Sequence, residues 1–184
     1  MRWVWIDKFL EFNSRQSARA IKNVTFAEEH LHDHYPGFPV MPGSLIIEGL
    51  AQTAGLLVGE ASGFGEKVIL AKISRARFFS HACPGDQLVY DVAVSDLRPE
   101  GAVVEGTARV GDRPVAEAEI VFAHLDERSR AKSLFEPKNF VFTMRLLGVF
   151  DVGRTADGHP LPEPPGLTAL KQRAGFSTKG ECTS

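Results

Sequence analysis

The stretch PGSLIIEGLAQTAGLLVG, residues 42–59, is apolar on nearly every side. A surface helix carries one apolar stripe, whereas a helix that is apolar all round is wrapped by the rest of the protein. Pro42 suits the first helical turn, and Gly59 suits the left-handed residue that ends a helix. The sequence therefore predicts a buried helix over residues 42–59, kept thin by small residues that let neighbouring segments approach: Gly49, Ala51, Ala54 and Gly55.

Four later segments are rich in β-branched or aromatic residues and alternate in part, which is typical of strands. Turn signals separate them, and we expect the four to form an antiparallel meander. Residues 17–26 are expected to supply another strand at the other end of the sheet. A long apolar helix followed by strands predicts an α+β fold in which a curved antiparallel sheet covers the helix. The four segments are residues 68–79, 87–97, 102–110 and 114–125.

The composition indicates one packed domain with an appendage, because single domains cluster around about 100 to 150 residues and this chain has 184. A net charge of −2 indicates no general attraction to nucleic acid or anionic lipid. Two distant cysteines favour neither a disulfide framework nor a zinc ribbon, so a cytoplasmic location is expected. Because the character of the sequence changes after Asp126, we predict a domain over residues 1–125 and a C-terminal extension of unassigned role over 126–184.

A histidine cluster and three prolines lead directly into the predicted helix. The prolines stiffen the backbone, so the loop presents His34 in a fixed place relative to the helix start, where Gly43 exposes N–H groups at the positive helix end. Glu48 is the only carboxylate inside the apolar run, and burial of an unpaired charge is costly enough to indicate a function. Desolvation favours its protonated form, which can donate a proton or orient a water. Gln52 lies one turn later on the same face, and we predict that it contacts the substrate.

The stretch HYPGFPVMPG at residues 34–43, followed by LIIEGLAQ at 45–52, resembles the 3-hydroxyacyl-[acyl-carrier-protein] dehydratases of bacterial fatty acid synthesis. The shared pattern is a histidine, an aromatic residue, proline and glycine, then PVMPG, then a helix bearing an acid fourteen places after the histidine. The similarity continues through ISRARF at 73–78 and PGDQL at 84–88, and it covers roughly residues 6–125. A glutamate at the acid position resembles the branch that only dehydrates.

This resemblance implies a hot-dog fold and a homodimer, or a higher oligomer such as a trimer of dimers, with each active site at a subunit interface. It implies dehydration of (3R)-3-hydroxyacyl thioesters on acyl carrier protein to trans-2-enoyl thioesters, without a metal or an organic cofactor. His34 of one chain would act as base on the α-carbon, and Glu48 of the other would assist departure of the hydroxyl. The N–H of Gly43, helped by Ser44, would bind the thioester oxygen, as an oxyanion hole does.

Three positions depart from the family pattern. Asp33 stands where glycine is common, Tyr35 where phenylalanine is usual, and Ser44 where valine or cysteine is common. None of them removes His34 or Glu48, but Asp33 is expected to alter the charge or tautomer of the neighbouring histidine.

Several alternatives remain open. His30, His32 and His34 alternate along one possible strand face. The stretch HLHDH at residues 30–34 is one residue short of the HxHxDH pattern of metallo-β-lactamase-type zinc hydrolases, and His30 and His32 are interpreted instead as supporting or surface groups. A hot-dog thioesterase and a non-catalytic acyl-thioester-binding subunit are the other two alternatives. Three cationic residues lie on a predicted strand: Lys72, Arg75 and Arg77. As a group they are expected to contact the carrier protein or its phosphopantetheine. For each residue taken alone, a solvated position at the strand edge is the simpler interpretation.

Overall fold

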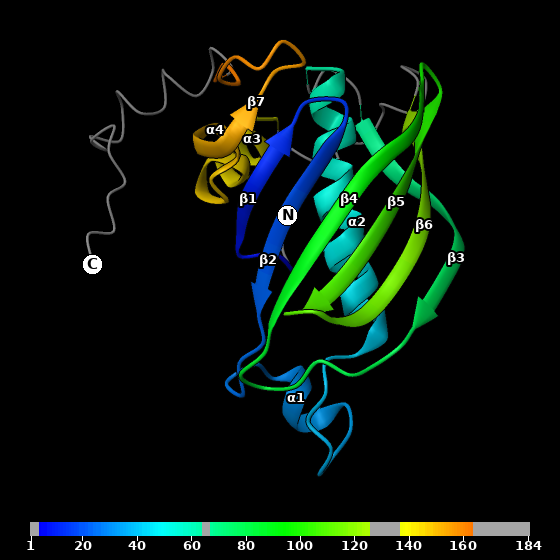
Figure 1. Ribbon diagram of the computed structural model, residues 1–184, viewed down its shortest axis with the longest axis vertical. Coiled ribbons are helices and arrows are strands. Elements are labelled where there is room, and N and C mark those ends of the chain that lie inside the picture. The colour runs from blue at the N-terminus through cyan, green and yellow to red at the C-terminus, as the bar shows by residue number, and fades with distance from the viewer. Residues whose placement is uncertain (1–3, 64–66, 126–136, 164–184) are drawn as a thin grey trace.

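The computed structural model describes residues 4–63, 67–125 and 137–163. A curved seven-stranded sheet wraps one long helix, α2, and this arrangement agrees with the predicted α+β layout (Figure 1). Within the described residues, three shorter helices accompany it. The strands are β1 (Lys8–Asn13), β2 (Ser17–Asn23), β3 (Lys67–Phe78), β4 (Gln87–Arg98), β5 (Gly101–Val110), β6 (Arg113–Leu125) and β7 (Gly153–Arg154); the helices are α1 (His30–Asp33), α2 (Gly43–Ala61), α3 (Pro137–Leu146) and α4 (Val149–Val152).

The central helix α2 begins one residue after Pro42, which is its N-cap. It continues past Gly59 to Ala61, and the left-handed residue is Gly63, with a φ of +60°. The predicted stop at Gly59 is therefore wrong. An apolar helix favours continuation as long as the sheet covers it, and Val58 and Gly59 are both buried.

The strand order is β3-β6-β5-β4-β2-β1-β7. Strands β4, β5 and β6 form the predicted meander, but β3 pairs with β6 and not with β4, so a meander of all four segments is wrong. The reason lies in the connections. Two residues join β4 to β5 and two join β5 to β6, which suits hairpins, whereas residues 79–86 carry the chain from β3 across to β4 on the far side of the meander.

The strand expected from residues 17–26 is β2, which pairs with β4 on the side of the sheet away from β3. It is not the last strand, because β1 pairs with it and β7 pairs with β1 in parallel. Since β7 belongs to the predicted extension, residues after 125 lengthen the same sheet. They also enter the same apolar core through Met144, Leu147, Val149 and Leu161. The domain boundary at residue 125 stays a prediction, and residues 126–136 and 164–184 lie outside the described residues.

The core lies between the concave face of the sheet and α2. Leu50 and Leu57 of α2 are fully buried, as are Phe9 of β1, Tyr90 of β4 and Ile120 of β6. None of the helices in the described ranges has the length and apolar character needed to cross a bilayer.

Candidate active site

Glu48 lies on the stripe of α2 that the sheet does not cover. Its neighbour on that stripe, Ser44, is also exposed, whereas Ile47, Gly49 and Leu50 are buried. The expectation that Glu48 is buried is therefore wrong for the single chain. Among the described residues the sheet wraps α2 on one side, and this leaves the side chain of Glu48 exposed.

The Glu48 carboxylate is held by the next turn of its own helix. Gln52 donates from Nε2 to Glu48 Oε1 at 2.9 Å, and the N–H of Trp5 donates to Gln52 Oε1 at 2.8 Å. Gln52 is only 8% exposed. Both ends of its amide thus have protein partners, which places Gln52 behind Glu48. Its predicted contact with substrate stays a prediction.

His34 is the C-cap of α1, and this short helix lies beyond the N-terminal end of α2 (Figure 1). It is exposed, its N–H donates to the carbonyl of His30 at 3.3 Å, and its ring meets that of Tyr35 edge to face at 4.4 Å. Residues 30–33 are helical, so the three histidines of HLHDH do not share a strand face, contrary to that expectation. Within residues 4–63, 67–125 and 137–163, no three histidine, cysteine, aspartate or glutamate side chains are grouped to bind a metal ion.

The short helix α1 is fastened to the sheet at three points. Leu31 is buried in the core, and Glu28, just before α1, forms an ion pair of 2.8 Å with the buried Lys22 of β2. The ring of His30 meets the indole of Trp5 edge to face at 5.1 Å. Burial lowers the pKa of His30 below its usual value, against the opposing charge of Glu28 and with the charge of Lys22 in the same direction, which favours the neutral ring. The segment that leads to His34, residues 28–33, is therefore anchored to the rest of the fold.

Gly43 opens α2 beside a pocket of about 500 Å³. A Cβ at Gly43 would lie 2.8 Å from the ring of Phe78, so only glycine fits there without displacing that ring. The lining is mostly apolar and aromatic, and Tyr35, next to His34, also contributes to it. The pocket thus lies beside both the positive end of α2 and the histidine loop. Its other lining residues are Phe38, Val40, Met41, Pro42, Ile46, Phe79, Ser80 and His81.

The single chain does not bring His34 and Glu48 into contact. Across the described ranges, the hydrogen bond of the Glu48 side chain is with Gln52, and the ring contact of His34 is with Tyr35. Asp33 is exposed, and no ion pair or hydrogen bond joins it to His34 in these same ranges. The expected effect of Asp33 on the histidine stays a prediction.

The three cationic residues predicted to meet a carrier protein lie on β3, an edge strand that is exposed from Leu70 onward. Arg77 lies 3.5 Å from Glu117 of β6 and 5.6 Å from the ring centre of Phe79. Arg75 and Lys72 are exposed on the same strand. A carrier contact for these residues stays a prediction.

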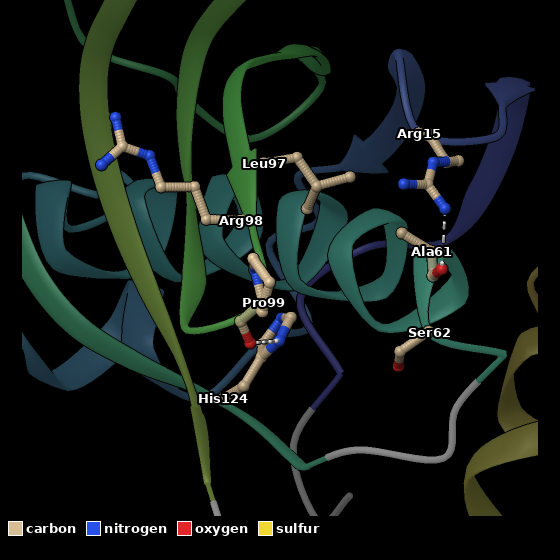
Figure 2. Close-up of a pocket in the computed structure, with 7 residues that line it drawn as sticks. All are labelled: Arg15, Ala61, Ser62, Leu97, Arg98, Pro99 and His124. Carbon is tan, nitrogen blue, oxygen red and sulfur yellow. Dashed lines mark hydrogen bonds between the residues drawn. The ribbon is translucent and has the colours of Figure 1, made fainter.

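A second pocket, of about 220 Å³, lies at the other end of α2 (Figure 2). Arg15 donates to the carbonyl of Ala61 at 3.4 Å, and Arg98 pairs with Asp96 at 2.8 Å with its guanidinium turned away from Arg15. Neither His34 nor Glu48 lines this pocket. The pocket lies beside the C-terminal end of α2, and none of the predicted site residues lines it.

Sequence reasoning did not find Trp5, Lys22 or Phe78 as parts of the site. Trp5 reaches Gln52 across 47 positions of the chain, and no local pattern reports such a contact. Lys22 is in phase with the buried Ala18 and Ala20 along β2, which is a usable signal for an inward-facing lysine that needs acidic partners.

Comparisons with known proteins place the chain in a family. A family model described as a FabA-like domain matches residues 3–119. A 3-hydroxyacyl-[acyl-carrier-protein] dehydratase FabZ of Caldanaerobacter subterraneus subsp. tengcongensis is 37% identical over 123 residues, which cover 66% of this chain and 87% of that relative. The FabZ of Pelotomaculum thermopropionicum is 40% identical over 119 residues, which cover 64% of this chain and 85% of the relative.

Among solved structures, a conserved protein from Pseudomonas aeruginosa superposes with a TM-score of 0.54 at 20% identity, over 64% of this chain and 87% of the other. At that identity the likeness concerns the fold alone. Together with the wrapped central helix, it confirms the predicted hot-dog fold. Because the family model matches more than half of the chain, and the relatives match over most of their own length, this chain belongs to the FabA-like family.

Proposed function

We propose that this chain is a hydro-lyase that dehydrates (3R)-3-hydroxyacyl thioesters of acyl carrier protein to trans-2-enoyl thioesters in fatty acid or related lipid biosynthesis. The observation that carries the proposal is the carboxylate of Glu48, held by Gln52 on the exposed stripe of α2, five residues after Gly43, which lines the apolar pocket. The FabZ names of relatives 37 to 40% identical support the same reaction.

In the proposed reaction, His34 takes the α-proton of the substrate, and the electron pair of that C–H bond forms an enolate. The N–H groups of Gly43 and Ser44, at the positive end of α2, stabilise the enolate oxygen. The enolate then collapses to the Cα–Cβ double bond while the Cβ–O bond breaks. Glu48 gives a proton to the departing hydroxyl, which leaves as water, and the proton taken by His34 restores the acid.

We further propose that the active protein is a homodimer in which His34 of one chain works with Glu48 of the other. Both side chains are exposed in the single chain and make no contact with one another within the described ranges. Strand β3 is an open edge that presents Leu70, Ile73 and Phe78 to solvent, and such an edge favours association. A partner would desolvate Glu48. A trimer of such dimers and a cytoplasmic location stay predictions.

The same edge bears on the carrier partner. Arg75 is exposed beside Arg77, and basic side chains on a strand favour contact with acidic proteins and phosphates. Arg75→Glu should therefore raise KM for a carrier-linked substrate several-fold while KM for the same acyl group on coenzyme A changes less. An equal change for both substrates would contradict the carrier contact.

The reaction is tested most simply in reverse, by following the loss of the conjugated enoyl chromophore when a trans-2-enoyl thioester is hydrated. Wild-type protein should hydrate it, and His34→Ala and Glu48→Gln should each lower kcat by about 100-fold or more. Release of free thiol would instead indicate a thioesterase. Tight acyl-thioester binding without turnover would indicate a binding subunit, and either result would overturn the proposal.

A further inference from the structure

We propose that Trp5 is a positioning residue that supports both reacting side chains of its chain at once. Its main-chain N–H donates to the amide that holds Glu48, and its indole ring meets the ring of His30, which opens the helix leading to His34. This inference rests on the proposed function, and it adds a residue outside the motif that the chain shares with its family.

The first support runs through Gln52. The N–H of Trp5 donates to Gln52 Oε1 at 2.8 Å, which turns the Nε2 group toward Glu48 Oε1 at 2.9 Å. A glutamine side chain alone can present either end of its amide to a carboxylate, and only the nitrogen end attracts it. Since Ile6, the next residue, is 1% exposed and packed in the core, the donor is fixed in place. Trp5 thereby selects the favourable orientation of Gln52.

The second support runs through His30. The rings of Trp5 and His30 meet edge to face, with centroids 5.1 Å apart and planes at 74°. The carbonyl of His30 accepts the N–H of His34 at 3.3 Å. Because α1 has only four residues, it has little stability of its own and depends on such contacts. The indole therefore stabilises the helical turn that ends at His34.

The two supports have a consequence in the dimer. Under the proposed arrangement, Glu48 and His34 of one chain serve different active sites, so one Trp5 supports a residue in each. Displacement of this segment would then disturb both sites of the dimer together, although Trp5 itself lies in neither.

The test uses the full chain in the enoyl hydration assay. Trp5→Leu removes the ring contact and should lower kcat by about threefold to tenfold while KM stays within about twofold. Trp5→Phe keeps a ring edge and should recover most of that loss. Gln52→Met removes the amide at similar size and should lower kcat by about tenfold. The matched control is Val4→Ala, at the exposed neighbour of Trp5, which should leave kcat unchanged.

A double-mutant cycle separates positioning from general destabilisation. His30→Leu removes the same ring contact, so adding Trp5→Leu to it should cost little further rate. The inference would be overturned if the loss of kcat in the double variant equalled the product of the losses in the two single variants. It would also be overturned if Trp5→Leu lowered the unfolding midpoint and left kcat unchanged. If Trp5→Leu does not fold, Trp5→Met takes its place in the same cycle. An inactive wild-type protein would refute the proposed function instead, so the two failures are distinguishable.

Discussion

Gly49 follows Glu48 on α2, at the point where the helix passes over the ring of Tyr90. A Cβ built at Gly49 would lie 2.5 Å from both Cζ and Oη of Tyr90 and 2.7 Å from Cε2, whereas ordinary contacts fall between 3.4 and 4 Å. Tyr90 has no exposed surface, so its ring cannot swing into solvent to make room. Gly49→Ala must therefore move the helix, the ring or both by about 1 Å.

Two opposing effects determine how much Gly49→Ala changes the free energy of unfolding. Alanine is favoured over glycine inside a helix by about 1 kcal/mol, while overpacking of a filled core costs about 1 to 3 kcal/mol. We expect a net loss of about 1 kcal/mol or more in the free energy of unfolding. Because the strain falls beside Glu48, a shift of about 1 Å should also lower kcat by as much as 100-fold.

Urea unfolding and the enoyl hydration assay measure the two effects. Gly55→Ala is the matched control on the same helix, because its Cβ would meet only Phe122 at an ordinary 3.4 Å, and it should be neutral or stabilising. Adding Tyr90→Leu to Gly49→Ala should restore part of both losses. A Gly49→Ala protein as stable and as active as Gly55→Ala would refute the packing described here.

Three further changes test the interior. Tyr90→Phe should leave the free energy of unfolding in urea unchanged or raise it by about 1 kcal/mol. The reason is that Tyr90 Oη is buried with no hydrogen-bond partner among the described residues. A clear loss of stability would contradict this and would mean that the hydroxyl forms a hydrogen bond in the folded protein. Lys22→Met should lower the free energy of unfolding by about 2 kcal/mol or more, because it leaves Glu28 without its ion-pair partner. It should also lower kcat, because this ion pair anchors the segment that leads to His34. Unchanged stability would contradict that role. Burial raises the pKa of Glu60 above 4.5, so its ionised form costs stability above that pH, and Glu60→Gln should raise the thermal midpoint at pH 8 but not at pH 4. An equal effect at both pH values would exclude the ionisation as its cause.

Much of the fold was predictable because its determinants are local. The apolar run over residues 42–59 predicts α2, since only a helix wrapped by other segments buries such a run. The two-residue links before Gly101 and Arg113 likewise predict the hairpins of the meander. The place of β3 beside β6 was not predictable, because an eight-residue connection leaves several sheet positions open.

The site was predictable in its residue types and not in its surroundings. The spacing of His34 and Glu48 within a family motif identified both. The exposure of Glu48 depends on which side of α2 the sheet covers, which is a property of the whole chain and its assembly. Helix α1 is too short to show a helical period, so its histidines looked like an alternating strand. The role of Trp5 arises from a contact 47 positions away.

The central claim is that His34 and Glu48 act together across a dimer interface, and mixed dimers test it directly. His34→Ala and Glu48→Gln proteins should each be inactive alone. When their chains are unfolded and refolded together, a mixed dimer has one site with both side chains intact and one site with neither. Random pairing in a two-fold dimer should then restore about a quarter of the wild-type activity in the enoyl hydration assay. If the mixture exchanges subunits and stays inactive, the two residues do not share a site across the interface.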